Sequence, residues 1–207
     1  MDTIILAGGK SSRMGENKAL LTIGEMRVID RLVDEYSTIS HQIILITNQP
    51  EVYDDLRVTI KSDVKEFRGQ GPLAGIYTGL KEATTATSLI IACDMPFASS
   101  AMGGWLEAEL VQGDYDAVIP SEDGQLHPLF GAYNRRIVPV VRNCLVEKKR
   151  RVTDLLSQLH MKIVEKQDAP KDLQDIWNDS FWNMNTKEDY RLALEIDRRI
   201  RGDKHEL

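Results

Sequence analysis

The chain is poor in cysteine. Only two of its 207 residues are cysteines, Cys93 and Cys144, and neither has a neighbouring Cys or His at the spacing of zinc ligands. We therefore expect both to be reduced thiols in or near the core. A disulfide-stapled secreted domain and a zinc module are excluded.

The chain also has no excess of positive charge and no long apolar segment. Its formal net charge is −6, which argues against a general nucleic-acid binder. No run approaches the ~18 apolar residues of a membrane span, and Lys10 and Arg13 interrupt the apolar start, so no signal peptide is expected. With 42% hydrophobic residues, residues 1–207 are expected to form one large cytoplasmic domain.

The stretch from Ile4 to Leu21 is the most informative part of the sequence. A short β-branched run leads into a polar segment that opens with Gly8 and Gly9. Paired glycines let successive backbone N–H groups approach one anion without a Cβ in the way. The cations of this segment are Lys10, Arg13 and Lys18, against the single carboxylate of Glu16. The pattern predicts a strand followed by a phosphate-binding loop.

Two common phosphate loops do not fit this stretch. A P-loop that ended in Gly9-Lys10-Ser11 would need a further glycine where Ile4 stands, and no register gives the Gly-x-Gly-x-x-Gly of dinucleotide-binding proteins. The alternative to phosphate binding is an ordinary strand-to-helix loop that happens to be basic. Such a loop would not need several cations beside paired glycines.

Polar residues follow the next expected strands. Asn48 comes directly after the apolar run 43–46, and Asp63 comes after a short strand at 58–60. Ligands of α/β proteins bind at the carboxyl edge of the sheet, so Asn48 could bond a base or ribose. Asp63 could accept hydrogen bonds from N1–H and the 2-amino group of guanine. The alternatives are a turn residue and a solvated surface aspartate.

Asp94 follows the most continuous apolar run, Leu89 to Cys93, which predicts a central parallel strand buried on both faces. A carboxylate at the tip of that strand suits Mg²⁺, which prefers oxygen ligands and shares them with substrate phosphates. The alternative is a cap for the helix expected near Ser100. Ser99 and Ser100 could cap that helix themselves.

Four further features leave their roles open. Gly75 and Gly79 lie on one face of a helix expected to begin at Pro72, so either a ligand or the sheet approaches that face closely. His127 lies on a strand expected from Leu126 to Tyr133, which Pro128 would confine to a sheet edge or mark with a bulge. It could line an acceptor pocket, act as a base or simply pack.

The run 148–151 consists of four cations, which could be a solvated face or an electrostatic lip that attracts an anion. Near the carboxyl end, Asn183 and Asn185 would point the same way on extended backbone. Thr186 and Asp189 form a variant capping box for the last helix. From about Lys204 the chain is expected to be a frayed tail.

Strands alternating with helices predict a three-layer, doubly wound (Rossmann-like) α/β fold with a mainly parallel sheet. Short helices are expected at 51–56 and 152–159, and 167–180 is expected to be a polar connection. Residues 18–23 are expected to be extended. The binding candidates all follow strand ends, so the fold would gather them at one edge.

These motifs together resemble one family. The run 6–9, Leu-Ala-Gly-Gly, then 12–15, Ser-Arg-Met-Gly, and then Lys18 is similar to the signature loop of nucleotidyltransferases. A second glycine at this place in the loop, Gly9, resembles the molybdenum cofactor guanylyltransferases of the MobA family. The runs 71–76 and 93–97 resemble two further motifs of that family. The run 183–189 resembles the family motif Asn-x-Asn-Thr-Pro-Glu-Asp, except that Lys187 replaces proline.

The resemblance spans residues 3 to about 195 and implies a nucleotidyltransferase that moves GMP from GTP to molybdenum-loaded molybdopterin, with Mg²⁺ as cofactor and release of pyrophosphate. It implies catalytic roles for Arg13, Lys18 and Asp94, with Asp94 as metal ligand. The implied GTP-binding residues are Leu6, Ala7, Gly8, Gly9, Lys18, Asn48, Asp63, Gly75 and Asp94. His127, Asn183 and Asn185 are the candidate acceptor contacts.

A monomer with transient contacts to other molybdenum cofactor proteins would fit this role. Two other functions stay open from the residues. One is a cytidylyltransferase acting on molybdopterin or another phosphorylated acceptor, because the loop alone serves several bases. The other is a catalytically silent nucleotide-binding module.

Overall fold

The computed structural model describes residues 1–8 and 17–202. Its main sheet has eight strands, in the order β10-β7-β9-β6-β1-β4-β5 with β8 paired to β7. The strands are β1 (Asp2–Leu6), β4 (Ile43–Ile46), β5 (Thr59–Lys61), β6 (Thr87–Ala92), β7 (Ala117–Glu122), β8 (Gln125–Leu126), β9 (Phe130–Asn134) and β10 (Met161–Val164). A separate hairpin pairs β2 (Thr22–Ile23) with β3 (Met26–Arg27).

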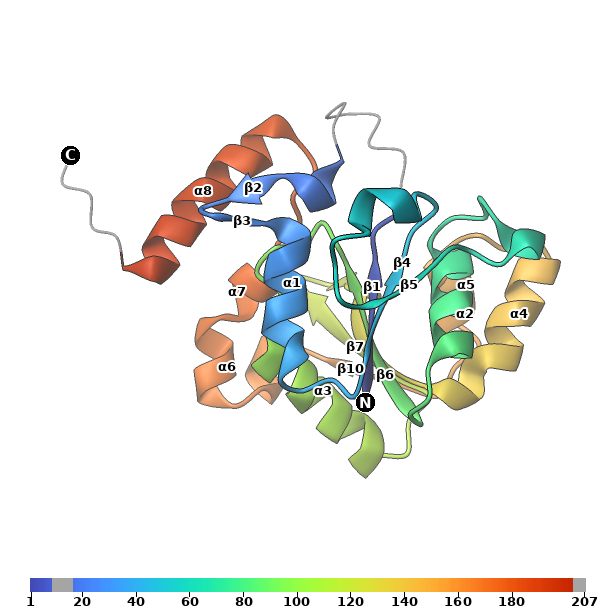
Figure 1. The fold of residues 1–207 in the computed structure, drawn as a ribbon. Helices are drawn as coiled ribbons and strands as arrows, with labels where there is room; N and C mark the ends of the chain where they lie inside the picture. Colours follow the sequence, from blue (N-terminus) through green and yellow to red (C-terminus); the bar gives the residue numbers. More distant parts are fainter. Residues whose placement is uncertain (9–16, 203–207) are drawn as a thin grey trace.

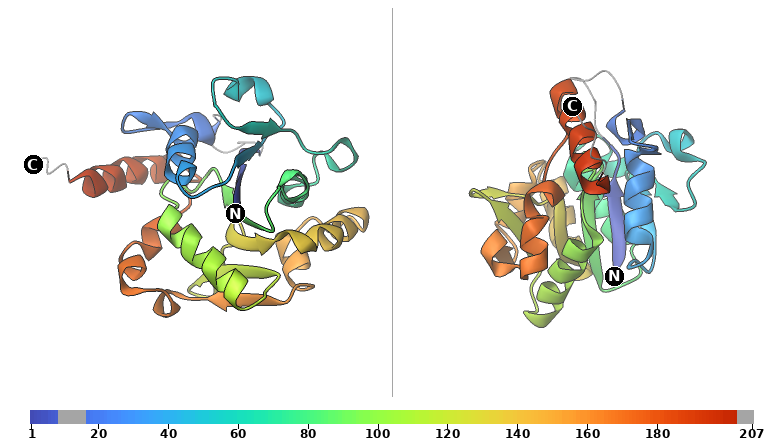
Figure 2. Two further views of the ribbon diagram at one scale, coloured as in Figure 1. Left: turned by 60° about the horizontal axis from the view of Figure 1, so that its bottom comes forward. Right: turned by 90° about the vertical axis from the view of Figure 1, so that its left-hand side faces the viewer.

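Helices cover both faces of the main sheet, which gives three layers (Figures 1 and 2). The helices are α1 (Val28–Ser37), α2 (Pro72–Glu82), α3 (Ser100–Gln112), α4 (Val138–Val146), α5 (Val152–Leu156), α6 (Lys171–Asp175), α7 (Trp177–Ser180) and α8 (Lys187–Arg201). Of these, α8 lies beside the β2–β3 hairpin rather than on a face of the main sheet (Figure 1). Single 3₁₀ turns are η1 (Lys18–Leu20), η2 (Pro50–Tyr53), η3 (Lys65–Phe67), η4 (Arg135–Ile137) and η5 (Lys166–Asp168). The predicted three-layer α/β fold is confirmed.

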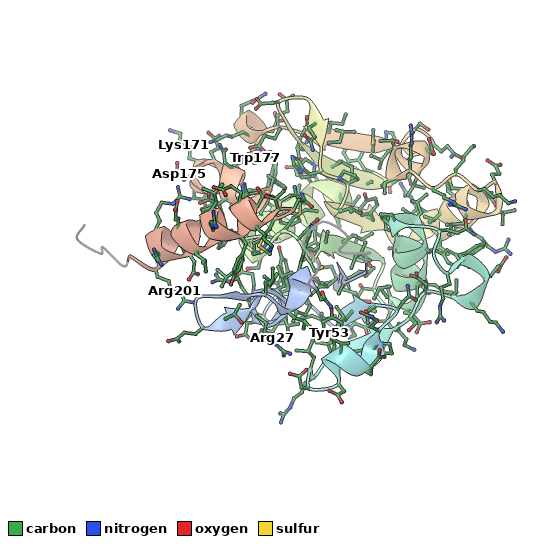
Figure 3. The ribbon with its side chains drawn as sticks, turned by 90° about the horizontal axis from the view of Figure 1, so that it is seen from above. Arg27, Tyr53, Lys171, Asp175, Trp177 and Arg201 are labelled. Carbon is green, nitrogen blue, oxygen red and sulfur yellow. The ribbon has the colours of Figure 1, made fainter. Side chains whose placement is uncertain are left out.

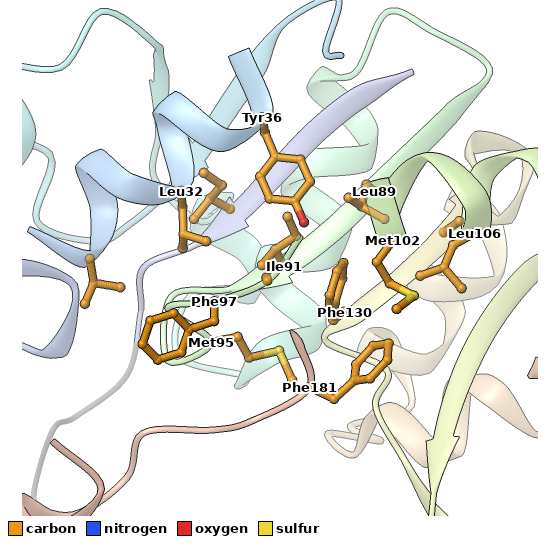
Figure 4. Close-up of a cluster of buried hydrophobic side chains, with 14 of the residues drawn as sticks. Leu32, Tyr36, Leu89, Ile91, Met95, Phe97, Met102, Leu106, Phe130 and Phe181 are labelled. Carbon is orange, nitrogen blue, oxygen red and sulfur yellow. The ribbon is translucent and has the colours of Figure 1, made fainter. Parts of the chain in front are cut away.

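The apolar strands explain why both faces need helices. All residues of β1 and β4 are buried, and alternate side chains point to opposite faces. Ile5 and Leu45 join the core under α1 and α3, whereas Ile4 and Ile44 join the core under α2 and α4. Figure 4 shows the first core, in which aromatic and aliphatic side chains from α1, α3, β6 and β9 meet.

The direction of the strands places one edge of the sheet for binding. β1 pairs in parallel with β4 and β6, and β4 pairs in parallel with β5. Their carboxyl ends therefore meet at the same edge, at the top of Figure 1. The antiparallel strand β9 lies between β6 and β7.

The strand predicted from Leu126 to Tyr133 is divided. β8 ends at Leu126 and β9 begins at Phe130, because Pro128 has no N–H for a ladder and the chain turns there. The Tyr133 hydroxyl donates to the Pro128 carbonyl at 2.7 Å and fixes that turn. Of the two alternatives predicted from Pro128, a sheet edge or a bulge, the edge is wrong, since β9 is paired on both sides.

Other boundaries also differ from the sequence pattern. The extended segment predicted at 18–23 begins with η1, and the helix predicted at 51–56 is the 3₁₀ turn η2. The polar connection predicted at 167–180 contains α6 and α7, because Leu173 and Trp177 pack into the core. The tail predicted from Lys204 lies outside the described residues.

The last helix is capped as predicted. The Thr186 hydroxyl accepts from the Asp189 amide, and the Asp189 carboxylate accepts from the Thr186 amide. Asp189 also accepts from the amide of Asn185 at 2.7 Å. Within residues 1–8 and 17–202, no helix is long and apolar enough to cross a membrane.

Candidate functional site: the cleft at the carboxyl edge

A cleft of about 680 Å³ opens at the carboxyl edge of β1, β4 and β6. Its lining residues come from the ends of these strands and from the beginning of α2. They are Leu6, Gly8, Ile46, Thr47, Asn48, Gln49, Asp63, Gly69, Gly71, Pro72, Gly75, Ala92, Cys93, Asp94 and Leu129. The volume is in the range of small-molecule and cofactor sites.

The end of β1 contributes backbone to the cleft. Leu6 and Gly8 line it, and the Ala7 amide donates to the Ile46 carbonyl at 2.9 Å, which extends the pairing with β4. Gly8 is exposed, and a Cβ placed on it would meet no atom of the described residues within 4 Å. A ligand could therefore approach the backbone there. Gly9 and Arg13 lie outside the described residues.

Asn48 and Asp63 form one polar wall of the cleft. The Asn48 side-chain amide donates to Asp63 Oδ2 at 2.8 Å. This contact holds the carboxylate in place from the neighbouring strand end. The structure thus brings together the two residues that sequence reasoning placed independently after β4 and β5.

The two helical glycines have different reasons for being small. A Cβ on Gly79 would clash with Ile4 of β1, so there the sheet approaches α2. A Cβ on Gly75 would lie 3.0 Å from Leu6 Cδ2, and Gly75 also lines the cleft. Before the helix, Gly69 and Gly71 have φ values of +79° and +77°, which favour glycine.

Asp94 lines the cleft with a buried carboxylate oxygen. Its Oδ1 is buried and has no hydrogen-bond partner among the described residues. Burial raises the pKa of this carboxyl, although the positive charge of Lys18 opposes the rise. Beside it, burial raises the pKa of the Cys93 thiol to about 12, so this cysteine stays a neutral thiol.

Asp94 is not the cap of α3. Ser99 is the N-cap residue but makes no side-chain cap bond, and the Ser100 amide donates instead to Glu35 Oε1 at 2.7 Å. The backbone carbonyl of Asp94 accepts from the Met184 amide at 2.7 Å. This bond ties the tip of β6 to the segment that leads into α8.

Lys18 connects this segment to the cleft. Its Nζ donates to Asn185 Oδ1 at 2.7 Å, and its charge lies close enough to lower the pKa of Asp94. The Asn183 amide donates instead to the Phe181 carbonyl at 3.1 Å. The structure therefore brings Asn185, rather than Asn183, to the lysine.

His127 is not among the residues that line the cleft. Its side chain is buried, and its ring packs 5.2 Å from that of Phe181. Its Nε2 is 3.9 Å from Glu122 Oε2 and has no hydrogen-bond partner among the described residues. Burial lowers the pKa of His127. In this part of the chain the cleft is lined by Leu129 instead.

The cationic run 148–151 lies near the cleft. The Arg150 carbonyl oxygen is 3.7 Å from the position of a Cβ on Gly71, which lines the cleft. All of these cations are exposed, and Lys149 pairs with Glu147 at 2.6 Å. An electrostatic lip is compatible with this position.

Sequence reasoning missed several lining residues. Gln49 lies next to Asn48 in the same polar turn, so the position of Asn48 could have predicted that Gln49 also lines the cleft. Thr47, Ala92 and Leu129 carry no chemical motif, and only the fold brings them to the cleft.

The fold and the cleft define an α/β protein with a ligand-sized cleft at the carboxyl edge of its sheet, which is where proteins of this architecture bind their ligands. Residues 3–163 match the model of the MobA-like NTP transferase domain, and the chain belongs to this family of nucleotidyltransferases.

A relative from Carboxydothermus hydrogenoformans, named probable molybdenum cofactor guanylyltransferase, is 40% identical over 192 residues, covering 93% of this chain and 94% of the relative. A second relative of that name, from Bacillus mycoides, is 34% identical over 195 residues, covering 92% and 94%.

Solved structures share the fold. Molybdopterin-guanine dinucleotide biosynthesis protein A from Archaeoglobus fulgidus superposes with a TM-score of 0.84 at 22% identity, covering 96% of this chain and all of the other. The 2-C-methyl-D-erythritol 4-phosphate cytidylyltransferase from Thermus thermophilus gives 0.67 at 12% identity, covering 96% and 100%. At these identities the likeness establishes the fold alone.

Proposed function

We propose that this protein transfers GMP from GTP to the terminal phosphate of molybdenum-loaded molybdopterin and releases pyrophosphate. The observation that carries the proposal is the Asp94 carboxylate, whose Oδ1 has no partner among the described residues, close to Lys18 in a cleft of about 680 Å³. The names of the relatives at 40% and 34% identity support the base and the acceptor.

Different residues of the cleft suit different parts of the substrates. The pair Asn48–Asp63 suits the guanine edge, since a carboxylate can accept from two adjacent N–H donors. Gly8 leaves room for phosphates to approach the backbone, and Gly75 lines the cleft on α2, where the nucleoside would lie. Asn185, which accepts a hydrogen bond from Lys18, would contact the acceptor.

The reaction needs positioning more than proton transfer. The acceptor phosphate is already ionised at neutral pH and attacks the α-phosphorus of GTP in line, while the bond to the pyrophosphate oxygen breaks. The barrier is the approach of two anions, so charge neutralisation and alignment supply the catalysis. Lys18, with Arg13, would stabilise the α-phosphate oxygens and the leaving pyrophosphate.

The residues fit a magnesium ion of the kind that substrate phosphates complete. Asp94 would hold Mg²⁺, because its Oδ1, which has no partner among the described residues, would supply a hard oxygen ligand. Among the described residues no group of three or more His, Cys, Asp or Glu could form an all-protein cage. That arrangement suits Mg²⁺, which keeps waters and binds through one or two carboxylates. Bound there, the ion supplies charge neutralisation of the triphosphate.

The site of the reaction is proposed to be the cytoplasm. Both cysteines are free thiols in the structure, Cys144 being buried, which supports a reducing compartment.

A thermal-shift panel tests the nucleotide first. GTP, CTP, UTP and ATP are each added with and without Mg²⁺. A ligand at about 100 times its dissociation constant adds ~2.7 kcal/mol, which moves the midpoint by several degrees in a chain of this size. We expect the largest shift with GTP and Mg²⁺, followed by GMP transfer to molybdopterin. A shift with CTP alone would favour the cytidylyltransferase, and binding without pyrophosphate release would favour the silent module.

A further inference from the structure

A buried tyrosine outside the cleft contacts the residue that precedes Lys18. The side-chain amide of Asn17 donates to the Tyr53 hydroxyl at 2.9 Å. Tyr53 belongs to η2 and is fully buried. It lies in the same core as Ala19.

Asn17 makes a second bond that shapes the backbone at Lys18. Its Oδ1 accepts from the Ala19 amide at 3.1 Å and caps η1, which begins at Lys18. The Asn17 amide group thus has its oxygen on η1 and its nitrogen on Tyr53. Because both ends of this planar amide are bonded, it has a single orientation. This orientation fixes the backbone at the start of η1 and so the direction in which the Lys18 side chain points.

Tyr53 is itself held by its surroundings. Figure 3 shows Tyr53 and Arg27 on neighbouring segments, η2 and the β2–β3 hairpin. Arg27 bonds both Asp30 at 2.7 Å and Asp55 at 2.5 Å, which ties the end of η2 to the hairpin and α1. Burial raises the pKa of Tyr53, with the Asn17 bond acting against it and the nearby Cys93 adding to it. The phenol therefore stays neutral at physiological pH.

The same turn also reaches the nucleotide side of the cleft. η2 begins directly after Asn48 and Gln49, and both residues line the cleft. Tyr53 is thus connected to the proposed base-binding turn through three residues of backbone and to Lys18 through one side chain.

We propose that Tyr53 is a positioning residue, which holds the Asn17 amide and thereby aims Lys18 at the reacting phosphates. The inference rests on the proposed function for the role of Lys18. A phenylalanine would fill the same core space but leave the Asn17 nitrogen without its partner. Asn17 could then rotate and release the cap of η1.

The test compares Tyr53→Phe with Tyr36→Phe. Tyr36 is also fully buried in the same core, but its hydroxyl has no hydrogen-bond partner among the described residues. Both variants lose one phenolic oxygen, and only the first loses a bond to Asn17. We expect Tyr53→Phe to lower kcat for GMP transfer about tenfold with KM for GTP within about threefold, because a small misplacement of a catalytic group acts on the chemical step. Tyr36→Phe should keep both constants.

A double-mutant cycle with Lys18→Ala separates positioning from loss of stability. If Tyr53 acts through Lys18, Tyr53→Phe should change kcat by less than about twofold in the Lys18→Ala background. Equal losses in both backgrounds, or an unchanged kcat in the single variant, would overturn the inference.

A chemical readout does not depend on transfer. Acetylation of Lys18, followed by mass spectrometry, should be about threefold faster in Tyr53→Phe than in the wild type and in Tyr36→Phe, since the Lys18–Asn185 bond loosens. Equal rates would contradict the inference. If the wild type transfers no GMP while this labelling difference is present, the proposed function fails and the positioning of Lys18 by Tyr53 stands.

Discussion

Asp2 and Asp94 are carboxylates at opposite ends of two neighbouring parallel strands, and their pKa values are shifted in opposite directions. Asp2 begins β1 at the amino edge and accepts from the Thr84 amide at 2.6 Å, the Thr85 amide at 3.1 Å and Gln42 Nε2 at 3.0 Å. All of these bonds go to Asp2 Oδ2, and the buried Asp2 Oδ1 has no hydrogen-bond partner among the described residues. Asp94 follows the neighbouring strand β6 at the carboxyl edge, and its Oδ1 also has no partner among the described residues.

The pKa values follow the partners. At Asp2, burial alone would raise the pKa, but hydrogen bonds from Gln42, Thr84 and Thr85 outweigh it and hold the pKa below its usual value. At Asp94, burial prevails over the charge of Lys18 and the pKa is raised. The comparison teaches that hydrogen bonds within the fold stabilise the ionised form of Asp2, whereas at Asp94 the effect of burial prevails. This difference supports the proposal that a ligand completes the surroundings of Asp94.

The largest expected effect is on turnover in Asp94→Asn. Removing the proposed metal ligand should lower GMP transfer by roughly 1000-fold, because the charge of the triphosphate would lose its counterion. The same variant should unfold at a higher temperature than the wild type without nucleotide at pH 7, since a charge that burial disfavours is gone. Asp172→Asn, at an exposed site, is the control and should change neither quantity. An Asp94→Asn variant that is fully active, or less stable, would break the comparison.

The stability effect of Asp94 has a definite pH dependence. A carboxyl whose folded pKa is raised favours folding at acidic pH, and this contribution is lost as the pH rises through the folded value. The stability gained by Asp94→Asn should therefore grow from acidic to neutral pH. A gain that is constant with pH in chemical denaturation would contradict the raised pKa.

The next effect is on stability in Asp2→Ala. The variant leaves buried donors without an acceptor and should lower the free energy of unfolding by about 3 kcal/mol, with kcat and KM unchanged below the transition. Because the pKa of Asp2 is lowered in the folded protein, its contribution to stability depends on pH. The contribution is present above the unfolded pKa and is lost as the pH falls through the folded value. Urea titrations between pH 3 and 7 measure both. A loss of activity without a loss of stability would place Asp2 with the functional edge.

The smallest effect concerns the choice of base. Asp63→Asn should weaken GTP binding about 30-fold, equivalent to about 2 kcal/mol for a charged hydrogen bond. It should also reduce the preference for GTP over inosine triphosphate, which lacks the 2-amino group. Asp54→Asn, on the exposed side of η2, is the matched control. Equal preference for the two nucleotides in the wild type would remove Asp63 from the base pocket.

Local chemistry explains which site residues could be predicted. Asp94, Asn48 and Asp63 each follow an apolar strand, so strand periodicity and the rule of the carboxyl edge were enough to bring them together. Pro128 shows the limit of such rules. It does stay out of the ladder, but the chain breaks the strand around it and places β9 in the interior of the sheet.

Contacts between distant segments could not be predicted in this way. Asn17 and Tyr53 are 36 residues apart, and neither forms a motif alone. Asn183 and Asn185 were expected to point the same way, but the Asn183 amide bonds the nearby Phe181 carbonyl. A side chain that bonds a nearby backbone group need not point the same way as the side chain two residues along an extended segment.

Calorimetric titration of GTP into wild type and Asp94→Asn, each with and without Mg²⁺, tests the central claim most directly. The account predicts that Mg²⁺ tightens GTP binding at least tenfold in the wild type and has little effect in Asp94→Asn. Equal enhancement by Mg²⁺ in both proteins would show that the carboxyl edge does not reserve Asp94 for a metal-bound nucleotide.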